Sequence, residues 1–260
     1  MKSIKSKTVV FVTGAFVSHI GWDKWVTYFE SKGYKAIAPS WPFKEDPPAE
    51  IRKRQPDARI ASLNLTQVVD NYANIINALP EKPIIIGHSL GGLITQLLVQ
   101  RGLADAAVIY HSVPPQGVLS FKWSFLKGVT PSLGLFTSAD KTYLMSFKHW
   151  QYTFTNGMPL AYQQEMYNKL VIPESKRAAR GALSSQGKVD FKRPHVPLLF
   201  LSGTKDNIIP PSLNYTNFKK YSHTGSIREY KEYPDKNHLA MDHANWREET
   251  DFIIDWLNNH

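Results

Sequence analysis

Near its middle the chain reads Ile84-Ile85-Ile86-Gly87-His88-Ser89-Leu90-Gly91-Gly92. The three isoleucines predict a short buried strand, and the residues from Leu93 to Val99 continue at helical spacing as far as Gly102. Ser89 is therefore expected in a tight turn that joins a strand to a helix.

The pentapeptide Gly87-His88-Ser89-Leu90-Gly91 fits the G-x-S-x-G pattern of a nucleophile elbow, and it stands between the strand and the helix that this pattern requires. Strained backbone at such a turn directs the serine Oγ away from the sheet, and unpaired N–H groups at the start of the helix can bind an oxyanion. The alternative is a glycine-rich turn that only connects two elements. The pentapeptide alone does not separate the two, but its flanking elements favour a nucleophile.

Length and composition predict one α/β domain with room for an inserted lid, because the chain has 260 residues and 42% hydrophobic residues. No apolar run is long enough to span a bilayer, and residues 1–7 lead directly into a strand rather than into a signal-peptide core. We therefore expect a cytoplasmic protein with no membrane partner.

The chain contains no cysteine, which excludes disulfides, thiolate metal sites and cysteine nucleophiles. No metal and no organic cofactor are expected. The formal net charge of +9 raises the question of nucleic acid, but the Lys and Arg residues are dispersed and form no nucleic-acid motif. We expect a small-molecule substrate and no nucleic-acid partner.

Short apolar strands alternate with amphipathic helices along the chain. The strands are predicted at 8–13, 34–38, 84–86, 106–110 and 196–202, with a more polar edge strand at 227–233. Unbroken apolar strands that alternate with helices predict a doubly wound, mostly parallel α/β sheet with helices on both faces.

Three local features are predicted outside the strands. Residues 39–64 have several prolines and no clear period, so they are expected to be irregular. Thr66 is expected to cap the helix that runs to Leu79, and Asn245 with Glu248 resembles a capping box before the last helix.

The alternation stops between residues 117 and 193. We expect core residues 1–116 and 194–260, with residues 117–193 forming a mostly helical cap inserted after the sixth strand. Most aromatic and methionine side chains of this segment should form its own core, and a minority should line an apolar substrate pocket. These side chains are Phe121, Trp123, Phe125, Phe136, Tyr143, Phe147, Trp150, Tyr152, Phe154, Met158, Tyr162, Met166 and Tyr167.

A serine nucleophile needs a general base and a third group that orients the base. Asp206 follows a buried strand, which puts it at the same sheet edge as Ser89, although an aspartate before Pro210 can also be a turn former. His238 follows the last strand and completes the chain order Ser, Asp, His. His243 is its rival, and His238 is favoured because it comes sooner after the strand.

Two backbone N–H groups are needed to bind an oxyanion. Leu90 is expected to supply the first, and Ala15 the second, with Phe16 as the alternative to Ala15. His88 is expected to pack against the elbow, and His111 to line the pocket.

Taken together, three motifs resemble the α/β-hydrolase superfamily: Gly87-His88-Ser89-Leu90-Gly91-Gly92, Ser-Gly-Thr-Lys-Asp at 202–206 with Pro210, and Asn237-His238. Within it the chain looks closest to single-domain esterases and the cofactor-free haloperoxidase-like branch. The resemblance implies Ser89 as nucleophile, His238 as base, Asp206 as acid, and Ala15 with Leu90 as oxyanion donors.

Two features depart from the usual pattern of that superfamily. Thr13-Gly14 stands where many members have His-Gly, and no leading hairpin is predicted before the strand that begins near Thr8, so the sheet is expected to have about six strands.

The leading functional hypothesis is a serine hydrolase that cleaves a small, moderately apolar carboxylic ester, or an amide, thioester or lactone, through an acyl-serine intermediate. The alternatives are a ligand-binding protein on a hydrolase scaffold, because fold alone does not establish activity, and a lyase or perhydrolase that uses the same catalytic triad.

Overall fold

The computed structural model describes residues 4–118, 120, 122–134 and 137–260. Its main sheet has six strands in the order β2-β1-β3-β4-β7-β8, and every neighbouring pair is parallel. The strands are β1 (Thr8–Val12), β2 (Lys35–Ile37), β3 (Ile84–His88), β4 (Ala106–Tyr110), β7 (Leu198–Gly203) and β8 (Arg228–Tyr233). The predicted doubly wound parallel sheet is confirmed, and so are its six strands and the edge position of β8.

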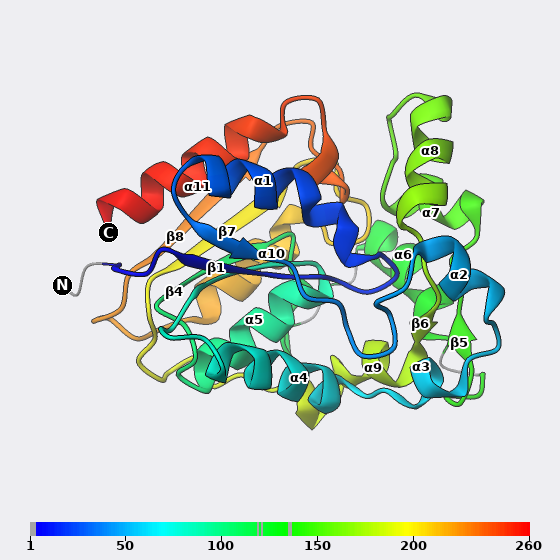
Figure 1. Ribbon diagram of the computed structural model, residues 1–260, viewed down its shortest axis with the longest axis horizontal. Coiled ribbons are helices and arrows are strands. Elements are labelled where there is room, and N and C mark those ends of the chain that lie inside the picture. The colour runs from blue at the N-terminus through cyan, green and yellow to red at the C-terminus, as the bar shows by residue number, and fades with distance from the viewer. Residues whose placement is uncertain (1–3, 119, 121, 135–136) are drawn as a thin grey trace.

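Helices cover both faces of the sheet (Figure 1). One face carries η1 (His19–Trp22), α1 (Asp23–Ser31), η3 (Ala240–Asp242) and α11 (Trp246–Asn259), and the other carries α4 (Leu65–Asn77), α5 (Leu90–Gln100) and α10 (Pro211–Lys220). Side chains alternate along β1 to fill both interfaces. Val9 and Phe11 pack with α1 and α11, whereas Val10 and Val12 pack with α4 and α5. This explains why the strand is apolar throughout.

Residues 117–193 are hereafter called the insertion, and those that the structure describes form a mostly helical segment between β4 and β7. It contains α6 (Trp123–Leu133), β5 (Thr142–Tyr143), α7 (Phe147–Thr153), α8 (Leu160–Leu170), β6 (Glu174–Ser175), α9 (Lys176–Gly181) and η2 (Ser185–Gly187). The two-residue strands β5 and β6 pair antiparallel in a small sheet of their own, which the sequence did not predict. Counted along this chain, the insertion follows the fourth strand of the sheet and not the sixth, because within the described residues no hairpin precedes β1.

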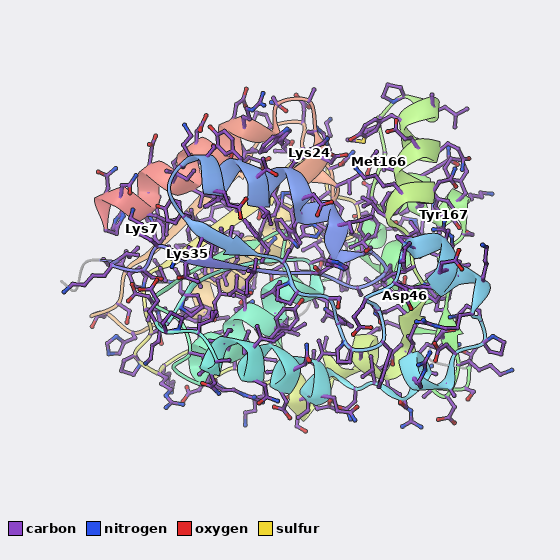
Figure 2. The ribbon with its side chains drawn as sticks, in the orientation of Figure 1. Lys7, Lys24, Lys35, Asp46, Met166 and Tyr167 are labelled. Carbon is purple, nitrogen blue, oxygen red and sulfur yellow. The ribbon has the colours of Figure 1, made fainter. Side chains whose placement is uncertain are left out.

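The insertion gathers at one end of the molecule, away from both termini (Figure 1). Met166 and Tyr167 of α8 lie at this end, and Lys7 and Lys35 lie at the opposite end (Figure 2). In the part of the chain that the structure describes, no helix is both long and apolar enough to cross a membrane.

The stretch 39–64 is less irregular than predicted, because it contains α2 (Pro48–Lys53) and α3 (Ala58–Ser62). Each helix is too short to show a clear period in the sequence. Ile51 of α2 and Ile60 of α3 are fully buried in a small cluster with Ile172 of the insertion. Tertiary packing therefore supports these helices rather than local propensity.

Both cap predictions are wrong. Asn64, not Thr66, caps α4, because its side chain accepts the Gln67 N–H while the Gln67 side chain accepts the Asn64 N–H. At α11 the Asn245 amide donates to the Glu248 carboxylate at 3.0 Å instead of capping a backbone N–H.

Gly91, in the first turn of α5, lies directly against β1. A Cβ at this position would stand 2.1 Å from the carbonyl oxygen of Val12. We expect Gly91→Ala to lower the free energy of unfolding by about 1–3 kcal/mol, the usual cost of overpacking. Urea unfolding measures the change. Gly21→Ala is the control, since its Cβ would meet side chains only at 3.6 Å or beyond. Equal stability of the two variants would contradict the close approach of α5 to β1.

Candidate active site

Ser89 occupies the turn between β3 and α5 with φ 58° and ψ −123°. This left-handed conformation is strained for a residue with a side chain. Three hydrogen bonds hold it: the Ser89 N–H donates to Tyr110, and the Ser89 carbonyl accepts from Gly92 and Val113. Gly14 approaches the turn so closely that a Cβ there would lie 2.7 Å from the Ser89 Cβ. The geometry is the strained elbow that the sequence predicts.

The structure brings Ser89, His238 and Asp206 together at the carboxyl edge of the sheet. The His238 Nε2 lies 2.9 Å from the Ser89 Oγ, and the His238 Nδ1 lies 2.6 Å from the Asp206 Oδ2. All three side chains are buried. With the Nδ1 proton donated to Asp206, the Nε2 lone pair is free to accept the proton of the Ser89 hydroxyl.

Asp206 is fixed through both of its carboxylate oxygens. Its Oδ1 accepts the N–H groups of Ile208 and Ile209 at 3.0 and 2.7 Å, and its Oδ2 accepts from His238 and His111. Burial alone would raise the pKa of Asp206, but the charge of His238 and the hydrogen bonds from His111 and His238 lower it well below its ordinary value. The carboxylate therefore stays ionised at neutral pH. The turn-forming bonds and the contacts to the histidines use different oxygens, so one residue can serve both predicted roles.

His111 does not line the pocket, contrary to the prediction. It is fully buried, and its Nδ1 lies 2.8 Å from the Asp206 Oδ2, so two histidines share one carboxylate oxygen. This contact could have been inferred from the order of the strands. His111 directly follows β4 and Asp206 closely follows β7, and these strands are neighbours whose carboxyl ends meet.

The other two candidate histidines are bonded away from Ser89. The His88 Nε2 donates to the His238 carbonyl at 2.8 Å. Burial is the main cause that holds the pKa of His88 well below its ordinary value, and electrostatic repulsion from the neighbouring His238 and His111 lowers it further. His88 is thus a neutral residue packed behind the elbow, as predicted, and it does not line the cavity. The His243 Nε2 donates to the Asn237 side chain at 2.9 Å, and burial lowers the pKa of His243 to about 4.

The two candidate partners for Leu90 in the oxyanion hole differ in their hydrogen bonding. The Phe16 N–H donates to the Glu174 carboxylate at 3.1 Å, so it is not available to a substrate. No hydrogen bond from the N–H of Ala15 or Leu90 occurs within the described residues. Both residues border the cavity beside Ser89. Of the two candidates, Ala15 is therefore the one whose N–H has no hydrogen-bond partner among the described residues.

A cavity of about 370 Å³ opens beside Ser89. The insertion forms much of its wall through Phe125, Leu126, Val129, Leu133, Phe154, Ala179, Ala182 and Leu183, and the core adds Ala15, Phe16, Leu90, Val113, Pro114, Pro115, Ile208 and Ile209. None of the described lining residues is charged. Such a wall suits an uncharged, apolar group.

Few of the aromatic side chains of the insertion reach this cavity. Among the described ones, Phe125 and Phe154 line it, whereas Trp150 is fully buried and stacks on Phe154 with ring centroids 4.6 Å apart. Phe121 and Phe136 lie outside the described residues. Trp150, Phe154 and Met166 are buried in an apolar cluster, and Tyr143, Phe147, Tyr162 and Tyr167 pack against the same cluster. Trp123, in contrast, is exposed and belongs to no core.

Solved structures share this architecture. A methylesterase from Arabidopsis is 16% identical with a TM-score of 0.68, and the aligned region covers 97% of this chain and 99% of that one. An extracellular alpha/beta-hydrolase from a Paenibacillus species is 17% identical with a TM-score of 0.70, covering 95% and 98% of the two chains. A monoacylglycerol lipase from Paleococcus ferrophilus is 19% identical with a TM-score of 0.68, covering 100% and 98%. At these identities the likeness shows the fold alone.

No curated protein matches the chain. The model of the Alpha/beta hydrolase family, in contrast, matches residues 9–248, from the first strand of the sheet into the last helix. The chain belongs to the alpha/beta hydrolase family.

Proposed function

We propose that the protein is a serine hydrolase that cleaves a small, moderately apolar carboxylic ester through an acyl-serine intermediate. One observation carries the proposal: the hydrogen-bonded series Asp206, His238 and Ser89 ends at a cavity whose described lining residues are uncharged. A buried base in contact with a strained serine activates the hydroxyl, and the cavity supplies a place for an apolar acyl or alcohol group.

In this proposal the His238 Nε2 takes the Ser89 proton as Oγ attacks the ester carbonyl carbon. The N–H groups of Ala15 and Leu90 bind the negative oxygen of the tetrahedral intermediate, and ionised Asp206 stabilises the imidazolium. His238 then donates the proton to the leaving alcohol. A water molecule that gives its proton to His238 then attacks the acyl carbon. The second tetrahedral intermediate collapses with cleavage of the bond to Oγ, which releases the acid, and the Ser89 Oγ takes the proton back from His238.

The similar structures support an ester as the substrate class. Two of them are a methylesterase and a monoacylglycerol lipase, and both names denote enzymes that act on esters. The absence of charge among the described lining residues favours an uncharged substrate, because burying an unpaired charge against an apolar wall is costly. Amides, thioesters and lactones would pass through the same steps.

A series of p-nitrophenyl esters, from acetate to long acyl chains, tests the proposal together with fluorophosphonate labelling of Ser89. Turnover with a defined optimum of chain length supports an esterase and gives the size of the acyl site. Labelling without turnover of any ester would point to a lyase or perhydrolase reaction on the same residues. A protein that neither turns over esters nor is labelled would be a ligand-binding protein on this scaffold.

Val129 of α6 lines the cavity and offers a way to shorten it. We expect Val129→Trp to lower kcat/KM for the longest accepted acyl chain by at least about tenfold, since each methylene excluded from a pocket is worth 10–200-fold. Turnover of the acetate ester should stay within about threefold of wild type, because a short chain does not reach the indole. Lys127→Trp is the control, because it adds the same ring at an exposed position of α6. Equal losses for short and long esters would contradict acyl binding in this cavity.

A further inference from the structure

A carboxylate of the insertion is buried beside the proposed oxyanion hole. Glu174 lies on β6, opposite Tyr143 of β5, and is fully buried. Its Oε2 accepts the Phe16 N–H at 3.1 Å. Its Oε1 accepts the N–H of Ser175 at 2.7 Å and forms an ion pair with Lys44. Lys44 is buried as well, and its ammonium group stands 4.1 Å from the centre of the Trp41 ring. None of these groups is used in the proposed reaction.

Phe16, whose N–H is donated to Glu174 and not to a substrate, directly follows the proposed oxyanion donor Ala15. Its backbone has φ 71°, a strained value for a residue with a large side chain. Both of its backbone polar groups are bonded to the insertion, since its N–H donates to Glu174 and its carbonyl accepts the Ile172 N–H at 2.9 Å. Its ring packs edge-on against Tyr143, with centroids 5.9 Å apart.

The other end of the same loop is held from the core. The Trp41 indole donates to the Thr13 carbonyl at 3.1 Å, and the Thr13 N–H donates to the Tyr72 hydroxyl at 3.3 Å. The loop 13–16 is therefore fixed at Thr13 by core side chains and at Phe16 by the insertion. Ala15 lies between these two points, and the peptide that joins it to Phe16 carries the N–H that Glu174 accepts.

We propose that Glu174 is a positioning residue that fixes the Ala15 N–H in the oxyanion hole through its hydrogen bond to Phe16, with Lys44 holding the carboxylate in place. Without that acceptor the Ala15–Phe16 peptide can rotate out of its strained conformation and carry the Ala15 donor with it. Oxyanion donors act only when they lie within hydrogen-bond distance of the position that the developing charge will occupy. A buried ion pair is weak support for stability, because apolar residues of the same shape often stabilise as well or better. A role in positioning accounts for the pair. This inference rests on the proposed ester hydrolysis.

Two double variants test the role without leaving a buried lysine unpaired. Lys44→Met/Glu174→Gln removes the ion pair but keeps a side-chain oxygen for the Phe16 N–H. Lys44→Met/Glu174→Met removes the same charges and has nearly the same shape, but it has no oxygen acceptor. For the best p-nitrophenyl ester, we expect the Gln variant to stay within about threefold of wild type. The Met variant should lose about 10- to 100-fold in kcat with little change in KM, less than the 10²–10³ of a lost oxyanion donor.

A comparison of inhibitors separates positioning from a purely structural role. An alkyl trifluoromethyl ketone, which forms an oxyanion on Ser89, should bind the Met variant more weakly by the same factor as the loss in kcat. The alkanol of equal chain length fills the cavity without forming an oxyanion, and its inhibition constant should not change. Thermal melting should be similar for the two double variants.

Equal kcat values of the Gln and Met variants, with wild type active, would overturn the positioning role and leave the proposed hydrolysis intact. Equal weakening of the ketone and the alkanol would also overturn it, because Glu174 would then shape the cavity rather than the oxyanion hole. A wild-type protein that hydrolyses no ester and resists fluorophosphonate would overturn the proposed function and this inference with it.

Discussion

Ser89→Ala is expected to lower kcat for the best p-nitrophenyl ester by about 10⁶-fold, the size of effect seen when a nucleophile or its base is removed from a catalytic unit of this kind. The hydroxyl 2.9 Å from the His238 Nε2 is the atom proposed to form the acyl-enzyme, and alanine leaves no substitute for it. His238→Ala should cost about as much. The double variant should be no slower than either single one, because the two groups act as a unit.

Ser112→Ala is the control for Ser89→Ala. Ser112 is also a buried serine that follows a strand of the sheet, but its hydroxyl donates to the Val113 carbonyl and accepts from Gln96. Its loss should leave kcat within about threefold. More than about one hundredth of wild-type kcat in Ser89→Ala, after contaminating esterases are excluded, would contradict the acyl-serine proposal.

Asp206→Asn is expected to lower kcat by about 10⁴-fold with the fold retained, as for an aspartate that fixes the histidine tautomer. The backbone N–H groups of Ile208 and Ile209 point at the Oδ1 position and will hold the amide oxygen there. The amide NH₂ then faces His238 and His111 in place of Oδ2. To accept from it, His238 must carry its proton on Nε2, where it can no longer take the proton of Ser89.

Steady-state rates and the NMR signals of the histidine ring protons measure the loss and its cause. The control is Asp235→Asn, an exposed aspartate in the loop just before His238, which should leave kcat within about threefold. A loss of less than tenfold in Asp206→Asn, or an unchanged tautomer of His238, would show that Asp206 does not orient the base.

The sheet and the meeting of Ser89, Asp206 and His238 could be predicted because both follow from local patterns. The strands β1, β3 and β4 are buried along their whole length, so each contains a continuous run of at least three apolar residues. Parallel strands place the residues that follow them at one edge, so finding the strand ends was enough to find the site.

The missed features depend on contacts between distant parts of the chain. His111 reaches Asp206 across 95 residues, and Glu174 reaches Phe16 across 158 residues. Glu174 in the sequence looks like an ordinary surface carboxylate, since nothing near it shows that Lys44 is buried beside it. The cap predictions for α4 and α11 were wrong for local reasons. At α4 the side chain of Asn64, two residues before Thr66, accepts the backbone N–H, and at α11 the Asn245 and Glu248 side chains bond to each other instead of to the backbone.

The two outer strands of the sheet affect how copies of this protein can meet. An open sheet edge can add a strand from another molecule and start aggregation. Here β2 provides only three residues, and its first and last residues, Lys35 and Ile37, are exposed. At the other edge, β8 reads Arg-Glu-Tyr-Lys-Glu-Tyr. If two copies paired through this strand, the charged side chains of one β8 would lie against the charged side chains of the other. A short edge on one side and a charged edge on the other both oppose edge-to-edge growth of the sheet at high concentration.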